Sequence, residues 1–207
     1  MNAKACALLL AIAMCALAAP LRAQDGDRFV VGLGIGPYKF TQTDDFRAKM
    51  LNLSSKDDAG AAQAYVEWYP WPSVGWGLRY LLIGSEDYAH LYVPPNVEEV
   101  HRWVDVHSLL ATVQWLPFDP NAYARPGLIA GVGQSRYEAR FQFGSSDTTR
   151  SSTGIAVLAG AFVDWGAEGF GARFGANSLN TDLDRIETAD VDATGFSVYL
   201  DLRWSIE

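Results

Sequence analysis

The chain has 207 residues, a formal net charge of -8 from 16 basic and 24 acidic side chains, and 49% hydrophobic residues. This hydrophobic content is too high for a disordered chain, and the acidic balance argues against nucleic-acid binding, which requires basic surfaces. After the N-terminal segment no apolar run is long enough for a membrane-spanning helix. The length fits one domain or one barrel.

The first 23 residues have the pattern of a secretory signal peptide. A short basic start precedes an apolar stretch, Ala5 to Ala19, which is too short to cross a bilayer, and a small-residue cleavage pattern then ends at Ala23. We therefore expect an exported protein with a signal peptide of residues 1–23 and one mature domain of residues 24–207. A lipidated Cys15 is the alternative, although Met14 is a poor residue before a lipidated cysteine.

An alternation of apolar with small or polar residues recurs in eight segments of the mature chain. The clearest is Gly195 to Ile206, in which six apolar residues alternate with six others without an error. A period of two predicts a strand with one apolar face. In chain order the segments are 29–36, 62–69, 74–82, 108–115, 127–143, 155–165, 170–177 and 195–206.

Two of these segments depart from a simple alternation. In the fifth, the apolar positions change phase between Val132 and Tyr137, and a β-bulge near Gln134 would explain the change. In the sixth, Leu158 and Phe162 make the second face apolar as well, so the pattern leaves the orientation of this strand open.

The connections between the segments alternate between short and long. An even number of strands with short turns at one end and long loops at the other is typical of an outer-membrane barrel. The sequence therefore predicts an all-β protein, an eight-stranded antiparallel up-and-down transmembrane β-barrel. Short connections are expected at 70–73, 117–126 and 166–169, and long ones at 41–60, 84–102, 144–152 and 179–193.

Tryptophan placement favours a membrane barrel over a soluble one. Every second strand has an outward tryptophan near its short-turn end, as expected for an aromatic girdle at a membrane interface. The alternative is a soluble periplasmic β-barrel that binds an apolar ligand and keeps these aromatics in its core. The expected girdle residues are Trp68, Trp115, Trp165 and Trp204, and the candidates for a second girdle at the other end are Tyr38, Phe40, Trp103, Tyr137 and Phe141.

The face opposite the tryptophans carries glycines and six charged residues, three acidic and three basic. A basic charge in the lipid-facing wall costs about 2–4 kcal/mol near the midplane. We therefore expect these residues in the lumen, which side chains just fill in a barrel of this size. A closed lumen with an ionic network is expected, and a proton or ion path is the alternative. The expected network is Glu67, Arg79, Asp164, Arg173, Asp201 and Arg203.

Two contacts within this network follow from spacing. If Glu67 lies opposite Gly77 in a hairpin that turns at 70–73, Arg79 is its diagonal neighbour and within reach. We expect Arg173, Asp201 and Arg203 to form a second cluster.

The whole pattern resembles small eight-stranded outer-membrane proteins such as the OmpA membrane domain and the OmpX/Ail group. The resemblance rests on the signal peptide, the glycine-alternating strand from Val31 to Gly36, the Trp-Tyr-Pro sequence at 68–70 and the aromatic-alternating strand from Phe196 to Trp204. It implies a porin-like fold in the bacterial outer membrane and assembly by the barrel-assembly machinery. Members of this family usually end on an aromatic residue, whereas the chain ends at Glu207, and we expect no peptidoglycan-binding domain after the barrel.

Patterns for cofactor or metal binding are weak. The spacing of Gly32, Gly34 and Gly36 does not fit a dinucleotide-binding loop, and the three histidines are scattered. We therefore expect no catalytic, cofactor-binding or metal-binding residues and no cofactor. A divalent-cation site at Asp182 with Asp184, or at Asp190 with Asp192, is the alternative to solvated charge in the acidic loops.

A lipid A-modifying enzyme, a deacylase or acyltransferase, is the alternative function. His107 is its candidate base, and the adjacent Ser108 points to the opposite face of the strand, so the nucleophile would have to be Ser135 or Ser197 from another strand.

Loops on a rigid scaffold are where binding usually lies. We therefore expect a monomeric structural or surface-interaction protein, not an enzyme, that acts through four long acidic extracellular loops. Its expected partners are membrane lipid, lipopolysaccharide and, during biogenesis, the barrel-assembly machinery, with no nucleic acid among them.

Overall fold

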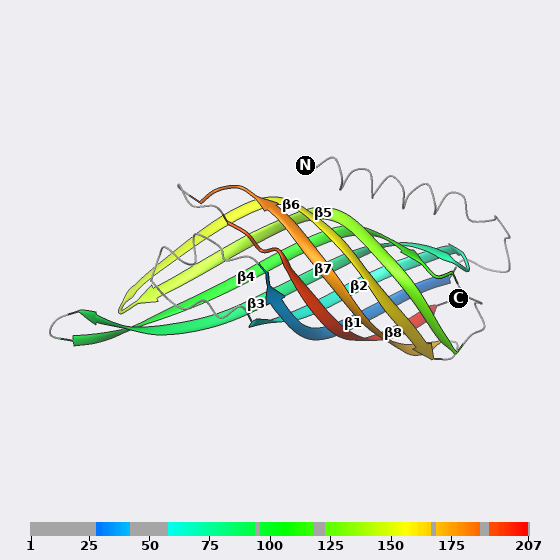
Figure 1. The fold of residues 1–207 in the computed structure, drawn as a ribbon, viewed down its shortest axis with the longest axis horizontal. Coiled ribbons are helices and arrows are strands. Elements are labelled where there is room, and N and C mark those ends of the chain that lie inside the picture. The colour runs from blue at the N-terminus through cyan, green and yellow to red at the C-terminus, as the bar shows by residue number, and fades with distance from the viewer. Residues whose placement is uncertain are drawn as a thin grey trace.

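Eight antiparallel strands form a closed barrel in which each strand pairs with the next and β8 pairs with β1 (Figure 1). The computed structural model describes residues 28–41, 58–93, 96–117, 123–166, 169–186 and 191–206. Within these residues there is no helix long and apolar enough to cross a membrane. The strands are β1 (Arg28–Phe40), β2 (Asp58–Trp71), β3 (Val74–Val93), β4 (Asn96–Trp115), β5 (Ala124–Phe143), β6 (Ser146–Gly166), β7 (Phe170–Leu183) and β8 (Gly195–Ile206).

The alternation that predicts the strands also decides which side chains face outward. In β8, Leu200 and Leu202 are 54% and 47% exposed on the outside, whereas Asp201 between them is completely buried in the lumen. Leu158 and Phe162 of β6 are buried in the same way, which settles the orientation of this strand. The barrel thus has an apolar exterior and a partly charged interior, the reverse of a water-soluble protein.

Strands β3 to β6 have 20 or 21 residues, whereas the other four have 12 to 14. The predicted long loops at 84–102 and 144–152 are therefore wrong. Residues 85–93 pair with residues 96–104, and β5 meets β6 at a two-residue turn where Gly144 has φ +56°. The sequence does not indicate these extensions because apolar residues there occupy the inward face, as Val104 and Val106 do, and polar residues such as Asp105 the outward face. The alternation therefore reverses while the backbone pairing continues.

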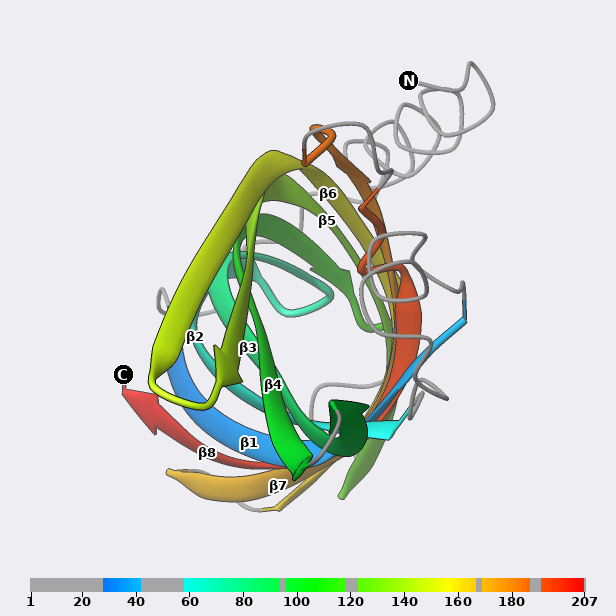
Figure 2. The same cartoon turned by 90° about the vertical axis from the view of Figure 1, so that its left-hand side faces the viewer.

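The four long strands continue as a sheet beyond the closed wall of the barrel (Figure 2). Among the described residues, the pairing of β2 with β3 ends at Gly60–Gly84 and that of β6 with β7 ends at Gly154–Leu183. We call the part of β3–β6 from the row Leu82–His107–Arg136–Thr153 outward the outer sheet. It comprises residues 82–93, 96–107, 136–143 and 146–153, of which residues 82–84 still pair with β2 at the edge of the closed wall.

The predicted bulge near Gln134 is wrong. β5 keeps an unbroken register against both β4 and β6, and Tyr137 and Ala139 are completely buried on the inward face. The apparent phase change arises because apolar residues occupy the outward face of β5 near the short turns, as at Leu128 and Val132, and the inward face farther out, as at Tyr137 and Ala139. A register shift is present instead between Trp68 and Trp71, where β2 turns into β3.

The lumen has a polar layer toward the short-turn end and an apolar layer toward the outer sheet. Along β3, the buried Arg79 is followed on the same face by the buried Leu81 and Ile83. Tyr38, Phe40 and Tyr137 belong to this apolar cluster and are at most 2% exposed, so their predicted place in a second outward girdle is wrong. Phe141 packs against the same cluster. Other members toward the outer sheet are Val104, Val106, Leu110, Ala139, Ala156, Leu158, Leu179, Ile186, Val191 and Ala193, and the cluster continues toward the short turns with Val30, Tyr65, Tyr69, Leu116, Ile129 and Phe162.

The other predicted connections fall partly outside the described residues. The turn at Pro72–Ser73 is present. Residues 42–57, 118–122, 167–168 and 187–190, like the predicted signal peptide 1–23, lie outside the described part of the chain.

Candidate functional site

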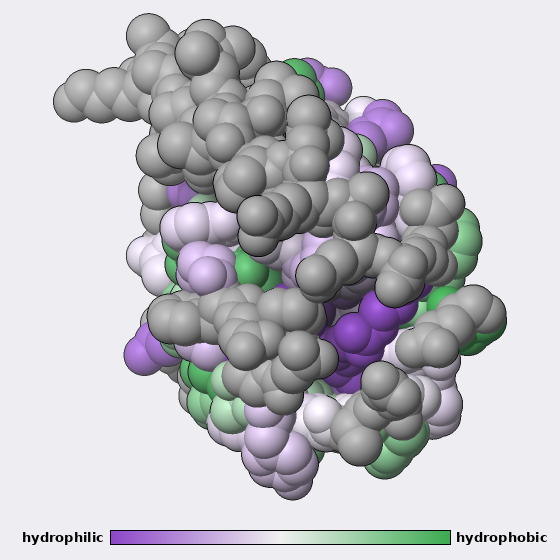
Figure 3. Space-filling model, turned by 90° about the vertical axis from the view of Figure 1, so that its right-hand side faces the viewer, coloured by the Kyte–Doolittle hydropathy of each residue, from purple (hydrophilic) through white to green (hydrophobic). Residues whose placement is uncertain are grey.

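All six charged residues predicted for the lumen lie inside the barrel wall. They come from β2, β3, β6, β7 and β8, and none is more than 7% exposed. Viewed from the short-turn end, strongly hydrophilic side chains are visible near the centre of the barrel (Figure 3). The residues are Glu67, Arg79, Asp164, Arg173, Asp201 and Arg203.

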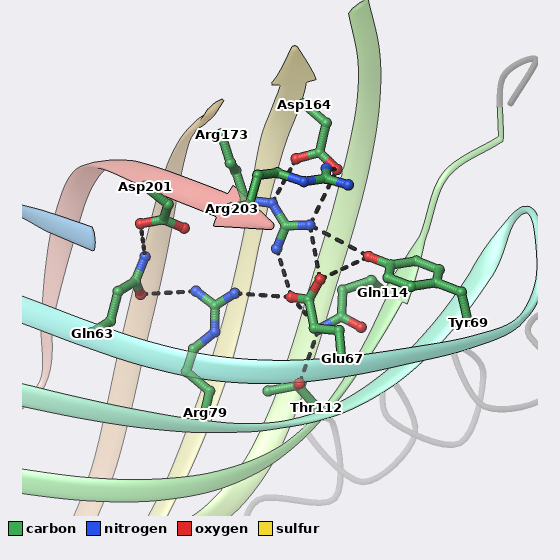
Figure 4. Close-up of polar contacts among 10 residues, drawn as sticks. All are labelled: Gln63, Glu67, Tyr69, Arg79, Thr112, Gln114, Asp164, Arg173, Asp201 and Arg203. Carbon is green, nitrogen blue, oxygen red and sulfur yellow. Dashed lines mark hydrogen bonds and ion pairs between the residues drawn. The ribbon is translucent and has the colours of Figure 1, made fainter. Parts of the chain in front are cut away.

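Glu67 is the centre of the network (Figure 4). Its two carboxylate oxygens accept hydrogen bonds from Arg173 Nη1 and Nη2 at 2.6 and 3.0 Å. Arg79 Nη2 donates to Oε1 at 3.4 Å, Gln114 Nε2 donates to the same oxygen at 3.0 Å, and the Tyr69 hydroxyl donates to Oε2 at 2.8 Å. The contact between Glu67 and Arg79 agrees with the register, in which Glu67 pairs with Gly77.

A second carboxylate, Asp164, holds the other side of Arg173. Arg173 Nε donates to Asp164 Oδ1 at 2.7 Å and Nη2 donates to Oδ2 at 3.2 Å. Arg203 forms an ion pair with the same carboxylate. Arg173 therefore bridges Glu67 and Asp164, and its guanidinium is completely buried between them.

Asp201 joins the network through an amide, not through an arginine. Gln63 Nε2 donates to Asp201 Oδ1 at 2.6 Å, and Arg79 Nη1 donates to Gln63 Oε1 at 2.8 Å. Arg173 and Arg203 meet at Asp164, and Asp201 is the cross-strand neighbour of Arg173 in β7 and β8, so the predicted separation into two clusters is wrong. The two predicted clusters are one continuous network.

Aromatic rings lie beside two guanidinium groups of this network. The Tyr65 ring lies 4.6 Å from Arg79 Cζ and 5.1 Å from Arg173 Cζ, measured to the ring centroid. Arg173 Cζ also lies 4.0 Å from the centroid of Phe162. These contacts place aromatic rings beside the buried guanidinium groups of Arg79 and Arg173.

Two glycines of β1 make room for this layer. A Cβ atom at Gly32 would overlap the Tyr65 ring, and one at Gly34 would overlap the Asp201 carboxylate. The glycine alternation of β1 therefore follows from the size of the side chains that lie across it.

The four predicted girdle tryptophans point outward from alternate strands. Each lies within the last four residues of its strand, at the short-turn end, and is between 37% and 42% exposed. Trp76 pairs with the first of them and is 40% exposed at the same end. The four residues are Trp68, Trp115, Trp165 and Trp204.

The outside of the outer sheet carries charged and aromatic groups. Arg136 forms an ion pair with Glu138 at 2.5 Å, and Arg140 donates to Asp147 from Nε at 3.1 and 2.8 Å. The hydrogen bonds from Arg140 hold the pKa of the Asp147 carboxyl below its ordinary value. These side chains are accessible, since Arg136 is 59% exposed and Arg140 is 58% exposed.

Trp103 lies beside these charges instead of joining the lumen. Its ring stacks on His101 with 5.6 Å between ring centroids, and Arg140 Cζ lies 5.7 Å from its centroid.

The structure separates His107 from the serines that an enzyme would need. His107 points outward, where its Nδ1 atom lies 2.6 Å from the Tyr80 hydroxyl. Ser108 and Ser135 are buried in the lumen and hydrogen-bonded to each other, and Ser197 is hydrogen-bonded to Asn177 there. A pair of His107 with Ser135 or Ser197 is therefore wrong, because the barrel wall lies between them.

Asp182 and Asp184 are exposed on the outer end of β7 and just beyond it, and Asp190 lies outside the described residues. In the part of the chain that the structure describes, no group of three or more His, Cys, Asp or Glu side chains could hold a metal ion.

A closed barrel with an apolar exterior, a charged interior and outward aromatics near one rim defines a transmembrane barrel of the outer-membrane type. The chain belongs to the outer membrane protein beta-barrel domain family, whose model matches residues 5–204. The protein is therefore located in the bacterial outer membrane, and the soluble periplasmic alternative is wrong.

Solved structures of small surface proteins share the fold. Neisserial surface protein A is 14% identical with a TM-score of 0.54, and the match covers 87% of this chain and 99% of that chain. Ail, the attachment invasion locus protein of Yersinia pestis, solved in complex with the heparin analogue sucrose octasulfate, is 14% identical with a TM-score of 0.54 over 87% of this chain and 100% of that chain. At this identity the likeness concerns the fold alone. No curated protein sequence matches the chain.

Proposed function

We propose that this outer-membrane barrel is a structural and surface-interaction protein that contacts lipopolysaccharide with the outside of its outer sheet and keeps its lumen closed. In this proposal the sheet replaces the four long loops expected from the sequence as the main interaction surface.

The observation that carries the proposal is a common level at which the exterior changes from apolar to polar. Tyr80, Leu109, Gln134 and Ile155 form the row just inside this level. The next outward row is Leu82, His107, Arg136 and Thr153, and three of its four side chains are polar. Because the barrel exterior below these rows is mainly apolar, we place them near the boundary between the hydrocarbon core and the lipid head groups.

The groups above this level fit the sugars and phosphates of lipopolysaccharide. Arginine binds phosphate through two parallel N–H groups, and Arg136 and Arg140 are more than half exposed. Each is held in place by its own carboxylate, Glu138 or Asp147, which offers oxygen ligands to the divalent cations that bridge anionic lipids. Trp103 adds a flat apolar surface beside Arg140.

The four tryptophans support the same placement in the membrane, because they lie at the opposite, short-turn end of the apolar wall. We propose that Trp68, Trp115, Trp165 and Trp204 form the interfacial girdle on the periplasmic side, since short turns of such barrels face the periplasm. In this position the apolar ring lies in the hydrocarbon and the indole N–H reaches water.

The closed lumen is supported by two successive layers. The ionic network fills the lumen near the short-turn end with side chains that are fully or almost fully buried. The apolar cluster that includes Leu81, Ile83 and Leu110 follows toward the outer sheet, and these three side chains are at most 1% exposed. An ion would have to cross both layers.

Retention of lipopolysaccharide by the purified barrel tests the proposal. A lost hydrogen bond to a charged group costs about 1.5–3 kcal/mol, so Arg136→Gln and Arg140→Gln should each lower the retained lipopolysaccharide about tenfold or more. Lys39→Gln is the matched control, because Lys39 is an exposed base near the outer end of β1. Equal retention by all four proteins would contradict the proposal.

Mass spectrometry of lipid A separates this function from the enzymatic alternative. Lipid A from cells with and without the protein is expected to have the same acyl chains, because His107 has the barrel wall between it and the buried serines. A change in acyl chains that disappears with His107→Ala would replace the binding function by an enzymatic one.

A further inference from the structure

We infer that a groove across the outside of β5, β6 and β7 holds one acyl chain of a phospholipid from the inner leaflet of the outer membrane. The groove has a volume of about 440 Å³. This binding site is separate from the outer sheet and does not depend on the proposed contact with lipopolysaccharide.

The register of the strands creates the groove. Gly127 pairs with Phe162, and Phe162 pairs with Gly175, so these three inward-facing positions form one row across the wall. All three positions face the lumen, where the ring of Phe162 lies against Arg173, so the outside of the wall presents only backbone along this row. The small outward side chains of Ala161 and Ala176 in the next row widen the recess.

The two neighbouring rows of outward side chains form the walls of the groove. One row contains Leu128, Ala161 and Ala176, which pair in succession, and the two alanines keep this wall low. The other row contains Pro126, Val163 and Phe174. Trp115 closes the end of the first row, and all of these residues line the groove.

The lining selects an apolar ligand. Every residue that lines the groove is apolar or glycine, so a polar headgroup would find no hydrogen-bond partner there. Inside a bilayer, apolar groups associate mainly through close van der Waals packing. A groove of this shape can pack closely against a flexible acyl chain.

The position of the groove points to the inner leaflet. Trp115, Pro117 and Pro126 lie at the short-turn end, near the proposed tryptophan girdle. Short turns of outer-membrane barrels face the periplasm. The groove thus opens toward the leaflet that contains phospholipid and is continuous with the lipid-facing wall of the barrel.

A second copy of the barrel fits the groove less well than a lipid chain. A closed dimer would place the same patch of both copies face to face, and two recesses opposed in this way leave a void. A single extended chain needs no complementary ridge on a partner.

Native mass spectrometry of the intact barrel tests this inference. The protein is refolded into vesicles of phosphatidylethanolamine and phosphatidylglycerol, extracted in a mild detergent and measured with its bound lipid. We expect one phospholipid per barrel for the native protein and at least a fivefold lower occupancy for Ala161→Phe, whose ring fills the groove.

Ala62→Phe is the matched control, since Ala62 is an outward alanine of β2 on another part of the wall. It should retain the lipid as the native protein does. If Ala161→Phe does not show the heat-dependent gel mobility of a folded barrel, Ala176→Leu takes its place, because Ala176 lies beside it in the groove.

Three outcomes would overturn the inference. They are a native barrel without bound phospholipid, a bound phospholipid that is unaffected by the groove variants, and a dimer that the groove variants abolish. Preferential retention of added lipid A over phospholipid, read from the mass of the bound lipid, would also overturn the assignment to the inner leaflet. Loss of lipopolysaccharide retention in Arg136→Gln leaves this measurement unchanged, so the two proposals fail or hold separately.

Discussion

Arg173 donates hydrogen bonds to both carboxylate oxygens of Glu67, although 106 positions separate the two residues in the chain. Glu67 is on β2 and Arg173 is on β7, so the contact crosses the lumen instead of joining neighbouring strands. Both side chains are completely buried. The pair thus connects two strands across the lumen. The stability of the closed barrel therefore depends in part on one buried carboxylate.

Removal of the charge of Glu67 should destabilise the barrel strongly. Glu67→Gln leaves the buried guanidinium groups of Arg79 and Arg173 without their shared carboxylate, and breaking a buried pair in this way costs about 3–5 kcal/mol. The free energy of unfolding in urea, measured on barrels in lipid vesicles, should fall by that amount. Asp105→Asn, at an exposed position of the outer sheet, should change it by less than about 0.5 kcal/mol. Equal stability of the native protein and Glu67→Gln would show that the network contributes nothing to folding.

A methyl group at Gly32 should disturb the same layer from the opposite wall. The new Cβ atom in Gly32→Ala would overlap the ring of Tyr65, which lies beside both Arg79 and Arg173. Overpacking of this kind costs about 1–3 kcal/mol, and the unfolding free energy in urea should decrease accordingly. Gly60→Ala is the control, because nothing lies within 4 Å of its added Cβ atom. If the two variants unfold at the same urea concentration, the close approach at Gly32 does not constrain the barrel.

The sequence predicts those parts of the network that depend on neighbouring strands. The tight turn after Trp71 sets the register between β2 and β3, and this register places Arg79 beside Glu67. The role of Arg173 was not predictable in the same way. Its partner lies across the lumen, and only the diameter and stagger of the closed barrel bring β7 opposite β2.

Neutral members of the network were also missed by sequence reasoning. Gln63, Gln114 and Tyr69 each make a hydrogen bond to a buried carboxylate. The signal for them was present, since each lies on the lumen face of its strand by alternation. A search restricted to charged residues overlooks them, although a buried ion needs several hydrogen bonds besides its counter-ion.

The outer sheet was missed for another reason. Within the membrane, lipid outside and charge inside give a strand a clear period of two. Beyond His107 in β4 the outside becomes polar and the inside becomes apolar at Val104 and Val106. The contrast between the two faces then reverses, so the same strand looks like an irregular loop.

Loss of the ionic network alone should not open a pore. The apolar layer with Leu81 and Leu110 lies beyond the network, and Glu67→Gln leaves it intact. In planar bilayers we expect no conductance steps from the native protein or from Glu67→Gln, whereas a porin in the same bilayer serves as the positive control. Channel activity of Glu67→Gln, in a sample with the gel mobility of a folded barrel, would show that the network is the sole barrier.

The pair of Arg140 with Asp147 should give the outer sheet a pH dependence that is confined to acid. The hydrogen bonds from Arg140 lower the pKa of Asp147 below its ordinary value of 3.8. Because the folded pKa lies below the unfolded one, the pair stabilises the hairpin between β5 and β6 above that value and is lost as the pH falls through the folded pKa. A titration of the Asp147 carboxyl carbon by NMR should show the lowered pKa in the native barrel and a return toward 3.8 in Arg140→Gln. Both side chains are exposed, so molar salt should weaken the shift. An Asp147 that titrates at its ordinary value in the native protein at low salt would mean that the two side chains do not pair on the membrane surface.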